Sequence, residues 1–238
     1  GKDVRVILIK LADRIHNMRT LDHMPPDKQI LTAQESLDIY APMAHRLGIA
    51  WIKTELEDLS LKYLHPEIYH QLKRNVARKK TDREKYIEEV ISVIARKLES
   101  EGIEADVTGR PKHFFSIYQK MERQNLLYDQ IYDLLGFRVL VDTPREAYEA
   151  LGIIHSHWRP VSGRFKDYIA VPKPNMYQSL HTSVIGPYGE RMEIQIRTHE
   201  MHRVAEEGIA AHWRYKEGED FHVSDIQRYT WLRQLLEW

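Results

Sequence analysis

The stretch 103–124, IEADVTGRPKHFFSIYQKMERQ, is where the chain changes from a helical pattern to alternating strands and helices. Its first eight residues alternate apolar and polar side chains, which is typical of a strand, and Gly109 ends the run. The residues that follow have helical spacing, with a proline where the first turn of a helix tolerates one. This order indicates a sheet domain that begins after Gly102.

Four further segments have the composition of short strands: 136–142 (GFRVLVD), 167–171 (DYIAV), 180–185 (LHTSVI) and 191–198 (RMEIQIRT). Helical segments are expected at 143–158 and 199–218. Because strands and helices do not alternate strictly, we expect a mixed sheet of about five strands flanked by helices. The expected fold class is α+β / α/β, with an all-helical N-terminal region before this sheet domain.

The first helical segment of the chain has apolar side chains on more than one face. One stripe follows helical spacing, and Val6 and Ile9 lie on the other side, so we expect burial of both faces. Asp13 falls within this second apolar zone, where a buried carboxylate needs a cation, a metal or several donors. An ion pair with Arg14 or Arg19 would satisfy it as well as a metal would.

Composition and charge exclude several classes of protein. The 238 residues include 35 Lys and Arg and 35 Asp and Glu, so no general adhesion to nucleic acid or membrane is expected. Cysteine is absent, and no apolar run approaches the roughly 18 residues of a membrane span. These features favour a cytoplasmic protein. Neither GxGxxG nor GxxxxGK(S/T) occurs, which excludes the common dinucleotide and P-loop motifs.

A polar stripe follows the predicted strand 103–110. Lys112, Ser116 and Lys120 are spaced i, i+4, i+8, so they line one side of a helix that begins just after a strand. Two ammonium groups and a hydroxyl near helix N-terminal amides suit a polyphosphate. A solvated lysine face would have the same spacing.

Two carboxylates and two guanidinium groups occupy or follow strand ends. Asp133 precedes one strand and Glu193 lies within another, so they are placed to share Mg²⁺, which binds through a few carboxylates and substrate phosphates. Ion pairing of one of them with Arg138 or Arg197 is the structural alternative. Arg110 and Arg138 have planar side chains that stack well on a purine.

Five blocks of the sheet region and two of the helical region resemble one family. The five are RPKHFFSIYQKM, DLLGFRV, GRFKDYIAVPKPNMYQSLHT, EIQIRT and AEEGIAAHWRYK. They resemble the synthetase domain of the long Rel/Spo alarmone enzymes, the stringent-response (p)ppGpp synthetase/hydrolases. DVRVILIKLADRIHNMRTL and APMAHRLGI resemble the C-terminal helices of their HD-type hydrolase domain. The resemblance covers essentially the entire chain.

The resemblance implies a nucleotidyltransferase-like fold and transfer of the β,γ-pyrophosphoryl group of ATP to the 3′-hydroxyl of GDP or GTP, with release of AMP. The residues implied for ATP are Arg110, Lys112, Ser116, Lys120 and Arg138. Those implied for catalysis are Asp133, Glu193, Lys166 and Arg164, of which Asp133 and Glu193 would hold Mg²⁺ and Glu193 would be the base. Those implied for the acceptor nucleotide are Lys173, Asn175, Tyr177, His181 and Gln195, with Tyr177 stacked on guanine.

The resemblance also implies a Mn²⁺-dependent hydrolase in the parent protein. Asp13 matches the last ligand of that metal site and Asn17 would lie beside the nucleotide. The upstream histidines and aspartate are not in this sequence. Hydrolase activity is therefore expected to be lost. Sensing of ribosome and tRNA would require regulatory domains outside this sequence, and neither nucleic acid nor membrane is an expected partner.

The expected domains are the end of the hydrolase domain (1–65), linker helices (66–101), the synthetase domain (102–215) and a C-terminal helical extension (216–238). Three interpretations follow. The chain is an alarmone synthetase, a metal-dependent hydrolase of the same alarmone, or a catalytically silent module that serves as a binding platform. The presence of both Asp133 and Glu193 favours the synthetase.

Overall fold

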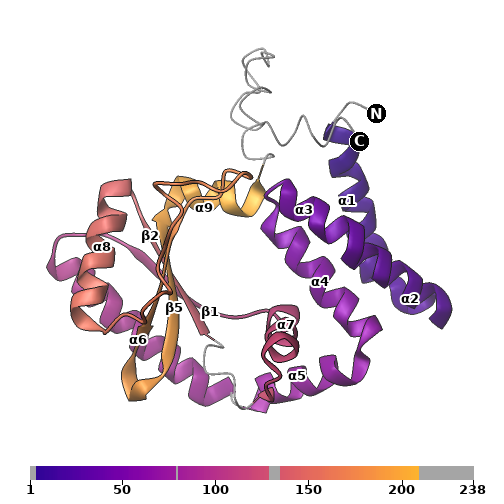
Figure 1. Cartoon of the computed structure of the whole chain (residues 1–238), viewed down its shortest axis with the longest axis horizontal. Helices are drawn as coiled ribbons and strands as arrows, with labels where there is room; N and C mark the ends of the chain where they lie inside the picture. The colour runs from indigo at the N-terminus through magenta and orange to yellow at the C-terminus, as the bar shows by residue number, and fades with distance from the viewer. Residues whose placement is uncertain (1–3, 79, 129–134, 209–238) are drawn as a thin grey trace. The chain divides into compact units, whose positions relative to one another are not determined.

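The structure is a computed structural model that describes residues 4–78, 80–128 and 135–208 (Figure 1). These residues form two compact units, a helical unit and a sheet unit. The helical unit lies within Gly1–Tyr69, Lys173–Tyr177 and Arg203–Trp238, and the sheet unit within His70–Pro172 and Gln178–His202. The short segment Lys173–Tyr177 thus belongs to the helical unit although both its neighbours in sequence belong to the sheet unit. The domain boundaries expected from the sequence stay a prediction.

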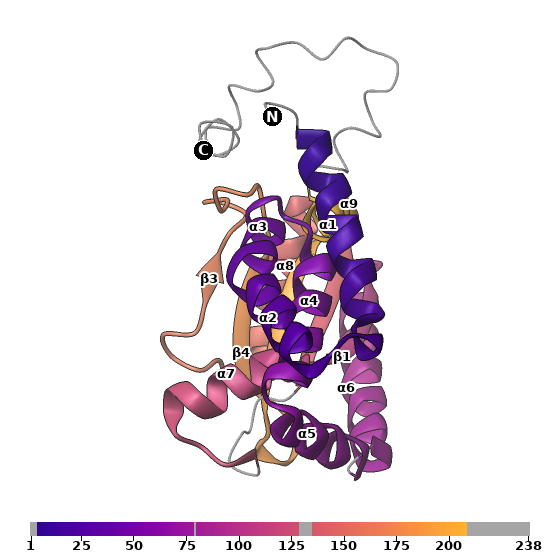
Figure 2. The ribbon, with the colours of Figure 1, turned by 90° about the vertical axis from the view of Figure 1, so that its right-hand side faces the viewer.

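The helical unit is built on one apolar core. Its elements are α1 (Val4–Arg19), η1 (Leu21–His23), α2 (Pro26–Glu35), the π-helical turn η2 (Ser36–Tyr40), α3 (Ala41–Arg46) and α4 (Ala50–Leu64). Leu11 of α1, Leu47 after α3 and Leu56 of α4 are buried together in this core. Helices α2 and α4 contact each other and lie side by side in Figure 2.

The predicted burial of α1 on both faces is wrong for the described structure. Leu11 and Ile15 are buried, but Val6 and Ile9 are 50% and 68% exposed. Asp13 is exposed, and it accepts a hydrogen bond from Asn17 Nδ2 at 3.3 Å rather than pairing with an arginine. Only one stripe of this helix meets the core formed by α2 to α4, so the opposite face faces solvent here.

The turn after α3 has a left-handed glycine. Gly48 has a φ of +75°, its N–H donates to His45 O at 3.1 Å, and Ile49 N–H donates to Ala44 O at 3.0 Å. This pair of bonds is the Schellman arrangement that ends many helices and needs a residue tolerant of positive φ. The carbonyl of His45 therefore lies at the C-terminal end of a long helical segment.

The sheet unit holds a five-stranded sheet in the order β1-β2-β5-β4-β3. The strands are β1 (Asp106–Pro111), β2 (Leu135–Val141), β3 (Lys166–Asp167), β4 (Leu180–Ile185) and β5 (Arg191–Thr198). The β2–β5 pair is parallel and the other three pairs are antiparallel. The predicted mixed sheet of about five strands is confirmed.

Helices cover the two faces of the sheet differently. The remaining elements are α5 (Pro66–Arg78), α6 (Lys80–Ser100), α7 (Phe114–Gln124), α8 (Pro144–His157), η4 (Pro187–Gly189) and α9 (His199–Glu207). Apolar side chains of α6 and α8 pack on one face against Val139, Ile194 and Ile196. Figure 1 shows α7 on the opposite side of the sheet from α6 and α8. The face toward α7 carries the polar residues of β5.

The strand predicted at 167–171 is wrong beyond Asp167. Asp167 Oδ1 accepts hydrogen bonds from the backbone N–H groups of Ile169 and Ala170, at 3.0 and 2.8 Å, and the chain forms a turn in place of the predicted strand. Tyr148 of α8 donates to the other carboxylate oxygen at 2.9 Å. A local side-chain bond of this kind competes with strand pairing, as Asp commonly does in turns.

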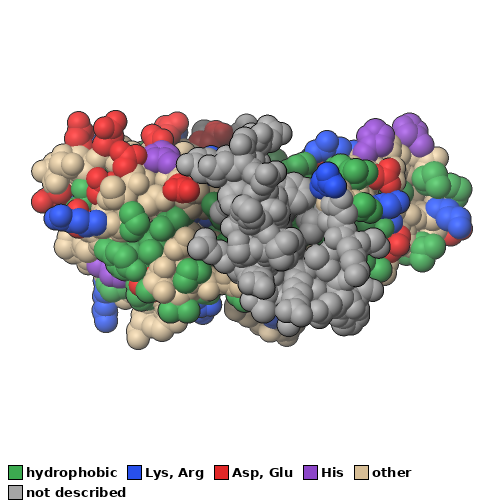
Figure 3. All heavy atoms as spheres, turned by 90° about the horizontal axis from the view of Figure 1, so that it is seen from above, with side chains coloured by type: hydrophobic (Ala, Val, Ile, Leu, Met, Phe, Trp, Pro, Cys, Tyr) green, Lys and Arg blue, Asp and Glu red, His purple; other side chains and the backbone are tan. Residues whose placement is uncertain are grey.

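Within the described residues, no helix combines the length and the apolar composition that a membrane span requires. On the coloured part of the face in Figure 3, acidic and basic side chains are scattered among apolar and uncharged ones rather than gathered into a basic stripe. This distribution matches the zero net charge of the whole chain.

Candidate active site

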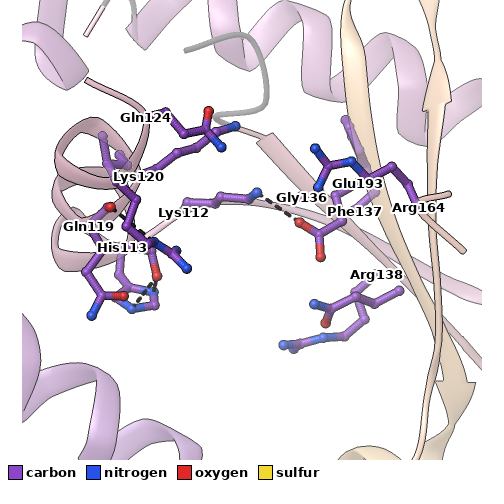
Figure 4. Close-up of a pocket in the computed structure, with 14 residues that line it drawn as sticks. Lys112, His113, Gln119, Lys120, Gln124, Gly136, Phe137, Arg138, Arg164 and Glu193 are labelled. Atoms are coloured by element: carbon purple, nitrogen blue, oxygen red, sulfur yellow. Dashed lines mark hydrogen bonds and ion pairs between the residues drawn. The ribbon is translucent and has the colours of Figure 1, made fainter. Parts of the chain in front are cut away.

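A polar cavity of about 660 Å³ lies between α7 and the strands β2 and β5 of the sheet unit (Figure 4). The described residues that line it include five cationic side chains and one carboxylate: Lys112, Lys120, Arg123, Arg138, Arg164 and Glu193. The cavity is therefore strongly cationic in a chain whose net charge is zero. Such an imbalance suits a ligand with several negative charges.

The carboxylate of Glu193 meets the ammonium of Lys112 across this cavity. Lys112 Nζ lies 2.8 Å from Glu193 Oε2, and Figure 4 shows the lysine side chain extended toward the carboxylate. His181 Nδ1 lies 3.7 Å from Glu193 Oε1. The side chains of Lys112 and Glu193 keep 25% and 28% of their exposure, so both stay accessible to a ligand.

The positions of Glu193 and Gln195 follow from the register of the sheet. Gly136 is opposite Glu193 and Arg138 is opposite Gln195 in the parallel β2–β5 pair. Ile194 and Ile196 point into the core, so Glu193 and Gln195 point to the cavity side. Asp133 lies outside the described residues.

The stripe predicted on one helix is distributed over a helix and the segment before it. His113 has an extended backbone and caps α7, so Lys112 precedes the helix while Ser116 and Lys120 lie on it. All three line the cavity. Ser116 Oγ lies 2.8 Å from His113 Nε2.

Four polar residues of the lining were not predicted from the sequence: His113, Gln119, Arg123 and Gln124. Arg123 lies seven residues after Ser116, so extension of the Lys112–Lys120 stripe by one helical turn would have found it. His113 has no periodic signal, because it contributes as the cap of the helix. Its proximity to Ser116 is visible only in the structure.

Arginine side chains reach the cavity from two places. Arg138 reaches it from β2, and Arg164 from the loop before β3 (Figure 4). Lys166 is exposed in β3, opposite His181, and is not among the described lining residues. The side chain of Arg110 lies outside the described part of the structure.

The residues expected at the acceptor nucleotide fall in both units. His181 and Gln195 belong to the sheet unit, and Lys173, Asn175 and Tyr177 to the helical unit. Within the helical unit, Lys173 Nζ lies 4.9 Å from the centre of the Tyr177 ring. Asn175 Nδ2 donates to His45 O at 3.0 Å.

The two metals suggested by the sequence differ in fit. Glu193 and Gln195 offer side-chain oxygens on the cavity side of β5, which are donors that Mg²⁺ accepts. For Mn²⁺, Asp13 has Asn17 as a hydrogen-bond partner on exposed α1. No group of three or more His, Cys, Asp or Glu within the described ranges is arranged to hold a metal ion. The described residues therefore do not form a Mn²⁺ site.

Two family models match the chain. The model for the region found in RelA/SpoT proteins matches residues 109–220, which includes the whole cavity lining, and the model for the HD domain matches residues 1–50.

The chain is also similar to curated proteins along its full length. A GTP pyrophosphokinase from Myxococcus xanthus is 58% identical over 238 residues, which is 100% of this chain and 31% of the relative. A bifunctional (p)ppGpp synthase/hydrolase RelA from Mycobacterium tuberculosis is 50% identical over 245 residues, 100% of this chain and 33% of the relative. The chain thus spans about a third of these relatives' length.

Among solved structures, the small alarmone synthetase 1 from Bacillus subtilis bound to its product pppGpp is 24% identical. The match covers 71% of this chain and 94% of that chain, with a TM-score of 0.45.

Proposed function

The chain belongs to the RelA/SpoT family, as its sequence blocks predicted, and on this premise we propose that it is a (p)ppGpp synthetase. The reaction is transfer of the β,γ-pyrophosphoryl group of ATP to the ribose 3′-hydroxyl of GDP or GTP. The 3′-oxygen attacks the β-phosphorus, the bond from that phosphorus to the α,β-bridging oxygen breaks, and AMP leaves. The 3′-hydroxyl proton goes to a base on the protein.

The observation that carries this proposal is the charge of the cavity. Five cations surround the single carboxylate among the described lining residues. They match the charge of a triphosphate, on which negative charge accumulates as the α,β-bridging bond breaks. Transfer of phosphoryl-type groups needs positioning and charge neutralisation more than covalent chemistry. Lys112, Lys120 and the Ser116 hydroxyl then hold the ATP phosphates, near the N-terminal amides of α7.

Glu193 serves as the general base in this proposal. Its carboxylate is the one acidic group among the described lining residues, and it keeps enough exposure to meet a hydroxyl. Bound polyphosphate would compete for Lys112 and release the carboxylate from the 2.8 Å ion pair. His181 Nδ1, which lies 3.7 Å from the other carboxylate oxygen of Glu193, would then lie close to the acceptor hydroxyl.

Mg²⁺ is the proposed metal, held by Glu193 with Asp133, and when bound it neutralises charge on the β- and γ-phosphates. Asp133 precedes β2 by two residues, and β2 is the strand that pairs with β5 beside Glu193. Arg138 and Arg110 would stack on the adenine, and Tyr177 on the guanine. Lys166 and Arg164 would add positive charge beside the transferred group.

The whole protein is proposed to be bifunctional. The HD-domain match at residues 1–50 supports a hydrolase function for the longer protein, with Mn²⁺ as its metal. We place the enzyme in the cytoplasm, where ATP and GTP are made and used. Any response to ribosome or tRNA would belong to regions outside these 238 residues.

Product analysis separates the three interpretations. The chain is incubated with ATP, GDP and Mg²⁺, or with ppGpp and Mn²⁺, and nucleotides are resolved by anion exchange. A synthetase releases AMP only when both nucleotides are present. A hydrolase converts ppGpp to GDP and pyrophosphate, and a silent module changes neither mixture. Hydrolysis of ppGpp without any AMP release would refute the proposal.

A further inference from the structure

The segment Lys173–Tyr177, here called the acceptor loop, is closed on itself. Met176 N–H donates to Lys173 O at 2.9 Å, and Lys173 N–H donates to Tyr177 O at 3.1 Å. Pro174 fixes one backbone angle of this turn, and Met176 has a φ of +64°. The two backbone bonds fold the loop onto itself, so a contact that holds the loop also sets the position of Tyr177.

The side chain of Asn175 ties the acceptor loop to the end of α3. Its Nδ2 donates to His45 O at 3.0 Å, and its Oδ1 accepts from Tyr177 N–H at 3.3 Å. His45 O also accepts from Gly48 N–H, so the turn after α3 and the loop meet at one carbonyl. Burial, then the charges of Lys53 and Lys173, lower the pKa of His45, which agrees with an ammonium close to this helix end.

The turn leaves little room for change at this contact. A Cβ on Gly48 would lie 3.4 Å from Asn175 O and 3.1 Å from Gly208 Cα. A Cβ on Gly208 would clash with Leu47 O. Backbone therefore packs on backbone where the loop is held, and the position of His45 O is set by the turn.

An amide side chain has two N–H donors and an oxygen that accepts twice. The bonds to His45 O and Tyr177 N–H use one donor and one acceptor site, and they decide which side of the amide is oxygen. One N–H and one lone pair remain, a donor and an acceptor side by side, which is the pattern that reads the edge of a nucleobase.

We propose that the turn at Leu47–Gly48 is a positioning element of the acceptor site, which orients the Asn175 amide through His45 O. The acceptor loop then supplies acceptor specificity through the Asn175 amide. This inference rests on the proposed function, because it takes the acceptor loop as the guanine-binding segment.

The test uses two glycines in the same backbone state. Gly48→Ala strains a helix-ending turn that contacts the acceptor loop. Gly102→Ala strains the matching turn after α6, where Gly102 has a φ of +78°, the same pair of backbone bonds, and no atom within 4 Å of an added Cβ. The comparison therefore removes the general cost of alanine at positive φ.

Dissociation constants for GDP and ATP are measured by calorimetry on both variants of the full chain. We expect Gly48→Ala to weaken GDP about fivefold or more, the size of one lost hydrogen bond, and to leave ATP unchanged. Gly102→Ala should leave both constants unchanged. Equal GDP affinities in the two variants would overturn the proposal.

Hydrogen exchange gives a readout that does not depend on the proposed function. In Gly48→Ala, amides of the acceptor loop should exchange faster than in Gly102→Ala, whether or not the chain makes AMP. Should Gly48→Ala fail to fold, Asn175→Asp keeps the acceptor for Tyr177 N–H but replaces the donor to His45 O. Unchanged exchange of the loop in Asn175→Asp would then refute the anchor itself.

Discussion

Glu193→Gln removes one negative charge from the cavity and keeps the shape of the side chain. In the structure this carboxylate pairs with Lys112 at 2.8 Å, and each side chain is about three-quarters buried. An exposed pair contributes about 0–1 kcal/mol to folding and a broken buried pair costs about 3–5 kcal/mol. We expect the free energy of unfolding to fall by about 1–2 kcal/mol, between these limits.

The effect on turnover should be far larger than the effect on stability. Loss of a positioned general base lowers the rate by roughly 10²- to 10⁴-fold, which corresponds to about 3–5 kcal/mol in the barrier. Loss of a metal ligand adds to this. ATP affinity measured without metal should hold or increase, because the five cations remain and the carboxylate that repels phosphate is gone.

The assay is AMP release under saturating ATP and GDP, beside calorimetric ATP binding in EDTA. Glu149→Gln is the matched control, since it removes a carboxylate that pairs with Arg145 at 2.8 Å on the surface of α8. That variant should keep normal turnover. Turnover of Glu193→Gln within threefold of the control would refute the role of Glu193 as base. A large loss of metal-free ATP binding would refute the reasoning about charge.

Substitutions at four other residues test the nucleotide contacts and the stability of the sheet unit. Tyr177→Ala should raise the KM for GDP about tenfold or more with little effect on the KM for ATP, since base stacking contributes roughly 1–3 kcal/mol. Tyr177→Phe should change both values little, and equal losses for both nucleotides in Tyr177→Ala would indicate a packing role. Arg138→Ala should do the reverse and weaken ATP more than GDP, as measured by the two dissociation constants; a selective loss of GDP would contradict it. Thr143→Ala removes the capping box of α8 and should lower the free energy of unfolding by about 0.5–2 kcal/mol with unchanged turnover, so an unchanged urea midpoint would be the adverse result. Burial lowers the pKa of His155, beside Thr182, below the ordinary 6.5. The neutral imidazole therefore contributes stability that is present above pH 6.5 and is lost as pH falls through the folded pKa. His155→Gln should reduce the loss of stability between about pH 7.5 and pH 5, and an unchanged loss would contradict this.

The strands with one buried face were predictable from the sequence. The segments predicted as 180–185 and 191–198 coincide with β4 and β5. Ile194 and Ile196 are buried in the core, and because side chains alternate along a strand, this places Glu193 on the opposite face of the sheet. The segment at 167–171 failed because Asp167 offers the backbone a local turn. Strand propensity takes no account of a hydrogen bond from a side chain to the nearby backbone.

The composition of the candidate site was partly predictable. Lys112, Ser116 and Lys120 reach the cavity as their spacing indicated, although Lys112 precedes the helix. His113 was missed because a cap has no period. The attachment of Asn175 to His45 spans 130 residues in sequence, and no local pattern encodes a contact of that range.

We propose that this chain transfers pyrophosphate from ATP to a guanosine nucleotide. The most direct measurement is phosphorus NMR of the products formed from ATP, GDP and Mg²⁺ by the purified chain. We expect one AMP for each GDP consumed, and a new diphosphate on the 3′-oxygen beside an unchanged 5′-diphosphate. Formation of ADP with a single phosphate on the acceptor, or consumption of ATP without any change in GDP, would contradict it.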